Sequence, residues 1–361
     1  MTPSRPRRRG LAAAAVTPSR PRRRALAAAA GLLAALAAGC GNGGGDGPGP
    51  PRPRPTTTVP LADGHGACTA PAAPAAHAPV LVTHFNTGRP PYLFGDRCAD
   101  LAKLRRAFNA VIVKAGDQQL VRDARSAGLA VYLEMDRKAD FARGEDVSAE
   151  VRQVVRQVRQ NPGTIAGVRV ADRLNDSLDP DRALAYLEAT GGVLHREVPG
   201  VPVLADVVNW ELVCGRRGQR NCLVLRFTRY RFEVNQVLTR FYRSGDLDGF
   251  MLALDLGRDD PAVVAAALRK ARALWPRPFQ LLARTAPSFD EPTYPGDAAD
   301  AERLADTVAR APLAAGADGV DLWAWHRPYR GRIRTFLDKD GSGNPFWDQL
   351  VAVAVEAGVS A

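Results

Sequence analysis

The amino-acid sequence predicts an α/β fold, specifically a (β/α)8 TIM barrel that occupies residues 79–361. Eight short apolar runs alternate there with eight stretches of helical periodicity, which is the order of a parallel barrel. The 361 residues are enough for one barrel of about 250 residues and an N-terminal extension. The main alternative, an open doubly wound sheet, usually carries a glycine-rich turn after its first strand, whereas this chain reads Asn-Thr-Gly-Arg-Pro-Pro-Tyr there.

Residues 1–40 are expected to be a lipoprotein signal peptide. Arginines come first, and the apolar run Ala25–Gly39 that follows is shorter than the about 20 residues that span a membrane. The run leads into Leu-Ala-Ala-Gly-Cys, which resembles a lipobox with Cys40 as the residue to be lipidated. We therefore expect an extracytoplasmic domain that is lipid-anchored to the cell membrane. The alternative is a simple cleaved secretion signal, and a repeated octapeptide leaves open whether translation starts at Met1 or Val16.

Residues 41–78 are rich in glycine, proline and alanine, so they cannot bury a core and are expected to form a disordered linker. The formal net charge is +11, but the signal segment holds eight arginines and no acid, which leaves +3 for the remainder. Composition therefore does not indicate a nucleic-acid partner. We expect a monomer.

The strands are predicted from short apolar runs. They are expected at Val80–Phe85, Ala110–Lys114, Ala130–Asp136, Ile165–Asp172, Val203–Val208, Phe250–Asp255, Phe279–Thr285 and Val320–His326. The helices follow the same order, at Ala99–Phe108, Gln118–Ala127, Val147–Gln160, Pro180–Glu197, Phe232–Ser244, Pro261–Trp275, Ala298–Ala311 and Pro345–Ala357. Asn344 before Pro345 is typical of a capped helix start, and glycines such as Gly128 and Gly245 favour helix ends.

The chain has five cysteines, and if Cys40 carries a lipid the other four make an even number suited to two disulfides. Cys68 and Cys98 would tie the N-terminal extension to the first crossover, and Cys214 and Cys222 would close a small loop. Disulfides indicate a domain outside the cytoplasm. The alternative is five unpaired thiols.

Functional residues of a TIM barrel lie at the carboxyl ends of its strands. The candidates at these positions are His84, Asn86, Lys114, Glu134, Asp136, Asp172, Asp206, Asn209, Asp255, Arg284, Asp321, Trp323, Trp325 and His326. Carboxylates dominate, and there is no Cys/His metal spacing, P-loop or GxSxG turn, so we expect no metal and no cofactor. Charges inside a barrel are unfavourable unless paired, so the alternative is a set of structural ion pairs. Those pairs would join Lys114, Arg169 and Arg284 to Glu134, Asp206 and Asp321.

The last strand places Asp321, Trp323 and Trp325 on one face, because alternate residues of a strand face opposite sides. Two indoles beside a carboxylate suit a sugar ring, whose CH groups pack on an indole face. The alternative role for the tryptophans is packing at the top of the barrel. Arg284 and His326 are expected to orient substrate groups. Further candidates for substrate binding are Asp321, Asp136, His84 and Lys114.

The stretch Ile165-Ala-Gly-Val-Arg-Val-Ala-Asp-Arg-Leu-Asn resembles the fourth strand of glycoside-hydrolase-like TIM barrels. In that superfamily the strand often ends in an acidic pair such as Asp-Glu-Pro, whose glutamate is the acid/base. Asp172 matches the first acidic position, and Arg173 stands where the glutamate would be. The resemblance implies a barrel that acts on or binds carbohydrate.

We expect metal-independent glycoside hydrolysis, with Asp172 as acid/base, Asp255 or Glu134 as the partner carboxylate, and Trp323 and Trp325 as the sugar platform. Such hydrolysis needs two carboxylates about 5–5.5 Å apart for retention or about 6.5–9.5 Å apart for inversion. The alternative is a non-catalytic envelope lipoprotein that binds a glycan or cell-wall polymer with the same mouth.

Overall fold

The computed structural model describes residues 68, 79–85, 96–208, 229–230, 232–253, 261–285, 298–323, 326–329, 332–336 and 343–359. All of these residues belong to one unit, Leu61–Ala361. The expected signal peptide and almost all of the expected linker lie outside the described residues. So do the candidates Cys40, Asn86, Asn209, Cys214, Cys222, Asp255 and Trp325.

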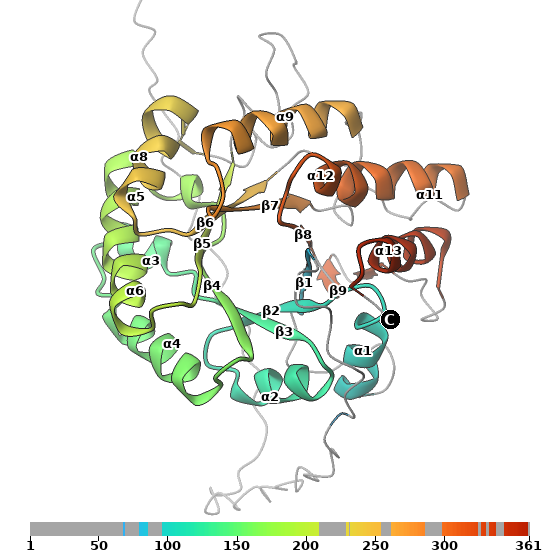
Figure 1. Cartoon of the computed structure of the whole chain (residues 1–361). Coiled ribbons are helices and arrows are strands. Elements are labelled where there is room, and N and C mark those ends of the chain that lie inside the picture. The colour runs from blue at the N-terminus through green and yellow to red at the C-terminus, as the bar shows by residue number, and fades with distance from the viewer. Residues whose placement is uncertain are drawn as a thin grey trace, which may run out of the picture. The chain divides into compact units, whose positions relative to one another are not determined.

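Eight parallel strands close into a barrel, which confirms the predicted fold (Figure 1). The strands are β1 (Val80–His84), β2 (Ala110–Lys114), β3 (Ala130–Glu134), β4 (Ile165–Ala171), β5 (Val203–Val208), β6 (Gly249–Ala253), β7 (Gln280–Thr285) and β8 (Gly319–Leu322). Each strand pairs with the next, and β8 pairs with β1 to complete the ring. The carboxyl ends of all eight strands therefore lie at one end of the barrel.

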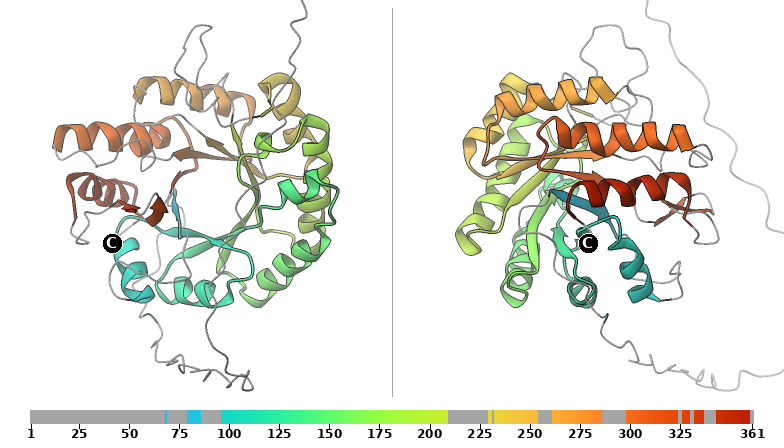
Figure 2. Two further views of the ribbon diagram at one scale, coloured as in Figure 1. Left: turned by 180° about the vertical axis from the view of Figure 1, so that it is seen from behind. Right: turned by 45° about the vertical axis from the view of Figure 1, so that its right-hand side comes forward.

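The helices form a ring outside the strands (Figures 1 and 2). They include α1 (Arg97–Leu104), α2 (Gln118–Ser126), α3 (Lys138–Ala142), α4 (Ser148–Gln160), α5 (Pro180–Leu187), α6 (Val193–Glu197), α8 (Thr239–Ser244), α9 (Pro261–Leu274), α11 (Ala298–Ala305), α12 (Ala311–Ala314) and α13 (Pro345–Glu356). Asn344 caps α13 as its sequence predicts, because its Oδ1 accepts a hydrogen bond of 2.9 Å from the Trp347 backbone N–H. None of the described helices is both long enough and apolar enough to cross a membrane.

The end of the last strand differs from its prediction. β8 stops at Leu322, and His326 begins a separate antiparallel hairpin of β9 (His326–Tyr329) and β10 (Arg332–Thr335). The apolar and aromatic character continues across this break, so composition alone does not reveal it. The Trp323 N–H still donates to the Thr285 carbonyl at 2.8 Å, which keeps Trp323 at the barrel rim.

The barrel interior is apolar below the carboxyl ends of the strands, and we call this part the lower layer. Its buried cluster consists of Val82, Ala110, Ile112, Tyr132, Leu204, Met251 and Leu282. Gly167 on β4 makes room for the Tyr132 ring, since a Cβ there would lie 2.6 Å from a ring carbon. A separate and larger apolar cluster fills the space between the strands and the helices.

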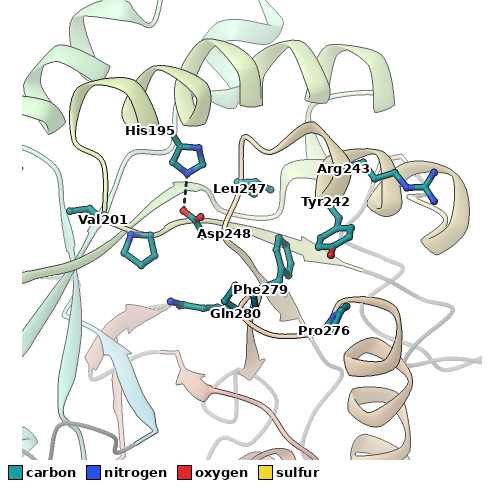
Figure 3. A pocket seen from close by; sticks show the side chains of 12 residues that line it. His195, Val201, Tyr242, Arg243, Leu247, Asp248, Pro276, Phe279 and Gln280 are labelled. Carbon is teal, nitrogen blue, oxygen red and sulfur yellow. Dashed lines mark hydrogen bonds and ion pairs between the residues drawn. The ribbon is translucent and has the colours of Figure 1, made fainter.

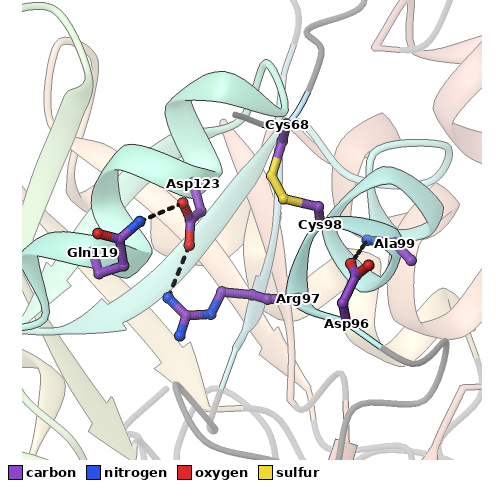
Figure 4. The surroundings of a disulfide bond; sticks show 7 residues. All are labelled: Cys68, Asp96, Arg97, Cys98, Ala99, Gln119 and Asp123. Carbon is purple, nitrogen blue, oxygen red and sulfur yellow. Dashed lines mark hydrogen bonds and ion pairs between the residues drawn. A yellow bond between two sulfur atoms is a disulfide. The ribbon is translucent and has the colours of Figure 1, made fainter. Parts of the chain in front are cut away.

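A disulfide joins Cys68 to Cys98 in α1, which confirms that predicted pair (Figure 4). The two Cα atoms are 5.3 Å apart. Next to it, Arg97 forms an ion pair of 2.8 Å with Asp123 of α2. The disulfide thus attaches a residue of the expected linker to the first helix of the barrel.

Candidate functional site

A layer of polar and charged side chains fills the barrel interior at the carboxyl ends of the strands. We call it the charged layer, and it consists of His84, Glu134, Arg169, Asp206, Arg284 and Asp321. On each strand, the residue two places before the member of the charged layer is apolar or glycine. Residues two apart on a strand face the same side, so both face the barrel interior. Register places Glu134 opposite Arg169 and Arg284 opposite Asp321. Opposite charges on neighbouring strands therefore meet.

Arg169 lies at the centre of the charged layer and is 1% exposed. Its Nη2 is 3.6 Å from Glu134 Oε1 and 3.3 Å from Asp172 Oδ1, and its Nη1 is 3.0 Å from His84 Nε2 and 4.0 Å from Asp321 Oδ2. Burial alone would lower the pKa of Arg169, but the surrounding carboxylates raise it above its usual value. The guanidinium stays charged and holds several acids in place.

Arg284 is the second bridging cation. It forms ion pairs with Asp172 and with the fully buried Asp206, and its Nε is 3.6 Å from Asp321 Oδ2. Because three carboxylates surround it, Arg284 acts first as a partner for acids inside the barrel. Its predicted role in orienting substrate stays a prediction.

His84 closes the layer on the β1 side. Its Nε2 is 3.2 Å from Asp321 Oδ2, and its Nδ1 is 3.8 Å from Glu134 Oε2. Burial lowers the pKa of His84 although Asp321 opposes the change, so the imidazole is neutral at neutral pH. The ring of the half-buried Trp323 is nearly perpendicular to the imidazole, at 6.2 Å between centroids.

Asp172 directly follows β4 and is more exposed than the layer beneath it, at 26% of its side chain. Its Oδ1 contacts Arg284, lies 3.3 Å from Arg169 Nη2 and lies 3.9 Å from Arg173 Nε. Burial alone would raise the pKa of Asp172, but the three arginines hold it well below its usual range. The carboxylate is therefore ionised, and its side chain is open enough for a ligand to approach it.

A strained turn follows Asp172. Arg173 has a left-handed backbone with φ of 50°, which residues other than glycine rarely adopt, and it leads into the short 3-10 helix η1 (Leu174–Asp176). The Asn175 Nδ2 donates to the Val208 carbonyl of β5 at 2.9 Å, which fixes the turn on the neighbouring strand. Burial raises the pKa of Asp176 to about 6, against the opposing effect of Arg173.

The remaining candidates have different positions. Asp136 forms an ion pair of 2.8 Å with Lys138, beyond the end of β3. Lys114 is exposed at the end of β2, and the cation beside Glu134 is Arg169. His326 belongs to β9 and not to the barrel.

Sequence reasoning missed two features of this site. The sequence predicts Arg169 only as one cation of a structural ion pair. In the structure its guanidinium lies beside four side chains, those of His84, Glu134, Asp172 and Asp321. Asp176 was not a candidate, because an acid several residues beyond a strand reads as a turn or capping residue. A signal was available for Arg169 alone, since an arginine in an otherwise apolar strand needs partners inside the barrel.

A cavity of about 630 Å³ lies at the opposite, amino-terminal end of the barrel (Figure 3). Its wall includes residues that directly precede β5, β6 and β7, and His195 contacts Asp248 there at 2.8 Å. The charged layer lies at the carboxyl ends of the strands, so the cavity is separate from it. Within the described part of the chain, no three His, Cys, Asp or Glu side chains form a group that could hold a metal ion.

No protein-family model matches the chain, and no curated protein matches it. Solved structures do share its fold. An exo-β-1,4-mannosidase from Opitutaceae bacterium strain TAV5 matches 80% of this chain at 12% identity and a TM-score of 0.54, and the match spans only 61% of the mannosidase.

Two further structures match over most of their own length. A thermostable mutant of a xylanase from Cellvibrio japonicus matches 77% of this chain and 98% of its own, at 13% identity and a TM-score of 0.52. GH5_18 from Streptomyces cattleya, solved in complex with GlcNAc, matches 78% of this chain and 81% of its own, at 15% identity and a TM-score of 0.51. At these identities the likeness shows the fold alone, which is a TIM barrel in each case.

Proposed function

We propose that the mouth of this barrel binds a carbohydrate and hydrolyses a glycosidic bond. One observation carries the proposal. Glu134 and Asp172, whose side chains are 15% and 26% exposed, both contact Nη2 of Arg169. Their nearest oxygens are therefore no more than about 7 Å apart, which suits a two-carboxylate mechanism.

The surroundings of this pair support the same chemistry. The sequence predicts Asp172 as the acid/base, but arginines hold its carboxylate ionised, which suits a nucleophile or a charge-stabilising group instead. Asp206 and Asp321 are fully buried, so they act on a ligand through Arg284 and His84 and not by contact. Trp323 at the rim offers an aromatic surface for a sugar ring. Similar folds occur in a mannosidase and a xylanase.

Hydrolysis can be tested with the full chain on a panel of oligosaccharides and aryl glycosides. We expect Asp172→Asn and Glu134→Gln each to lower turnover at least about 100-fold while binding is retained. Asp181→Asn is the matched control, because Asp181 on α5 is 83% exposed and should leave turnover unchanged. Absence of turnover on every substrate would contradict hydrolysis.

A non-catalytic glycan-binding role is the second candidate. Arg173 stands where related barrels place a glutamate, and three arginines share Asp172 Oδ1. An acid engaged in this way can simply stabilise the mouth. Binding of an oligosaccharide without turnover, in the wild type and in both variants, would favour this role.

We also propose that the domain is extracytoplasmic and anchored through a lipid on Cys40. The Cys68–Cys98 disulfide supports an oxidising compartment. Cells fed labelled palmitate should label the wild-type protein and not Cys40→Ser, and the variant should leave the membrane fraction. Equal labelling of both proteins would exclude this anchor.

A further inference from the structure

The turn after β4 attaches the chain to the end of β5. Arg173 adopts φ of 50° and ψ of 73°, and the Asn175 side chain then bonds both backbone groups of Val208, donating to its carbonyl at 2.9 Å and accepting from its N–H at 3.3 Å. A left-handed residue other than glycine is unfavourable and persists only when its surroundings enforce it. These bonds to β5 supply that constraint, and they fix the position of the next residue, Asp176.

Asp176 lies close to Asp172, for which we propose the role of nucleophile. Its Oδ2 is 3.1 Å from Arg173 Nε, and Asp172 Oδ1 is 3.9 Å from the same atom. The two carboxylate oxygens are therefore no more than about 7 Å apart, so both can contact one glycosidic bond. The Asp176 side chain is 19% exposed, and Oδ2 is its only carboxylate oxygen that a bound ligand could reach. Its Oδ1 is buried and has no hydrogen-bond partner among the described residues.

We propose that Asp176 is the general acid of the site and donates the proton to the departing glycosidic oxygen. This assignment rests on the proposed hydrolase function, and in it Glu134 positions Arg169 at 3.6 Å and does not donate the proton. A buried carboxyl oxygen without a partner is tolerated better in a neutral carboxyl than in a carboxylate. In agreement, burial raises the pKa of Asp176 to about 6, whereas arginines hold the pKa of Asp172 low. Two carboxyl groups with opposite shifts are typical of an acid and its ionised partner.

The reaction balances with one water molecule. Asp172 Oδ2 bonds to the anomeric carbon as the glycosidic C–O bond breaks, and Asp176 transfers its proton to the leaving oxygen. Asp176, now a carboxylate, then takes a proton from water. The water oxygen bonds to the anomeric carbon as the bond to Asp172 breaks, which restores both groups and retains the anomeric configuration.

Two classes of substrate, one whose leaving group needs a proton and one whose leaving group does not, distinguish proton donation by Asp176 from any other role. The full chain is assayed on 2,4-dinitrophenyl glycosides, whose leaving group needs no proton, and on methyl glycosides of the same sugars, whose leaving group does. In Asp176→Asn, kcat for the methyl glycoside should fall at least about 100-fold while formation of the covalent intermediate from the dinitrophenyl glycoside stays within about threefold of wild type. Asp176→Glu should partly restore the first rate, and Asp181→Asn should change neither.

The wild type provides a check that does not depend on a variant folding. Its kcat/KM for the methyl glycosides should fall above about pH 6, while that for the dinitrophenyl glycosides should not. Equal losses on both substrates in Asp176→Asn, or one shared alkaline limb in the wild type, would overturn the assignment and leave the hydrolase function standing. Failure of the wild type to cleave either class would overturn both.

Discussion

The barrel interior contains two layers of side chains, one apolar and one charged, on the same strands. The lower layer packs Val82, Tyr132, Leu204 and Leu282 together, and none of these side chains carries a charge. The charged layer begins two residues further along each of these strands, and it encloses the fully buried acids Asp206 and Asp321. The strands and the pairing are shared, so the fold itself does not require charges at this level.

This contrast assigns the two layers different roles. Burial of apolar side chains in the lower layer stabilises the folded barrel by about 25 cal/mol for each Å² of apolar surface buried. Buried ion pairs often contribute no more to stability than apolar residues of the same volume, although the loss of one partner is strongly destabilising. We infer that the charged layer is kept for what it does at the mouth, and the following predictions test that inference.

The largest effect is expected in the charged layer from Arg284→Met. Removal of this cation leaves Asp206 and Asp321 buried with fewer partners, so the free energy of unfolding at pH 7 should fall by about 3–5 kcal/mol. Urea denaturation measures it. The loss should shrink below pH 4, where the acids can take up protons; a loss that is independent of pH would contradict the ionic explanation.

Leu282→Ala, two residues earlier on β7, is the matched change in the lower layer. It removes a fully buried side chain and leaves a cavity, so we expect a loss of about 3 kcal/mol. The loss should be the same at pH 7 and pH 4, because no charge is involved. A strong pH dependence would show that the two layers are coupled.

Asp176→Asn should stabilise the protein at pH 8. The folded-state pKa of Asp176 is raised to about 6 from 3.8, so the unfolded chain loses the proton first and stability falls as pH rises between these values. An uncharged amide removes that loss, and we expect a gain of about 2 kcal/mol over wild type at pH 8 and little difference at pH 4. Thermal unfolding at the two pH values measures the difference. A variant that is less stable than the wild type at pH 8 would contradict the prediction.

The smallest effect concerns His84. Its folded-state pKa is below 6.5, so the unfolded chain binds the proton first and stability falls as pH drops below about 6.5. His84→Gln cannot titrate, so its stability should fall less than that of the wild type between pH 7 and pH 5, by at most about 1.4 kcal/mol per pH unit. Parallel curves for the two proteins would contradict a neutral buried imidazole.

Much of the barrel follows from local patterns in the sequence. The bounds of β2 and β5 match their predicted ranges, because an apolar run with polar or turn residues on both sides shows where a strand begins and ends. The run that ends at His326 is the exception, since β8 breaks after Leu322 without a glycine or proline to mark the break. Short elements such as α3 lack enough periodicity to be recognised.

The site is only partly predictable, because its chemistry depends on contacts across the barrel. Position at a strand end identifies Glu134, Asp172 and Asp321, but it cannot show that Arg169 reaches all three. The left-handed Arg173 has no sequence signature, since such positions usually carry glycine or asparagine. The raised pKa of Asp176 arises from burial, which only the folded chain creates.

The most direct test replaces three of the buried charges together. In the combined variant Asp206→Leu, Arg284→Met and Asp321→Leu, the charged layer becomes more like the apolar layer below it. If these charges serve the mouth and not the fold, the free energy of unfolding at pH 7 should equal or exceed that of the wild type. A loss as large as that of Arg284→Met alone would show that the ion pairs themselves hold the barrel together, and would contradict this interpretation.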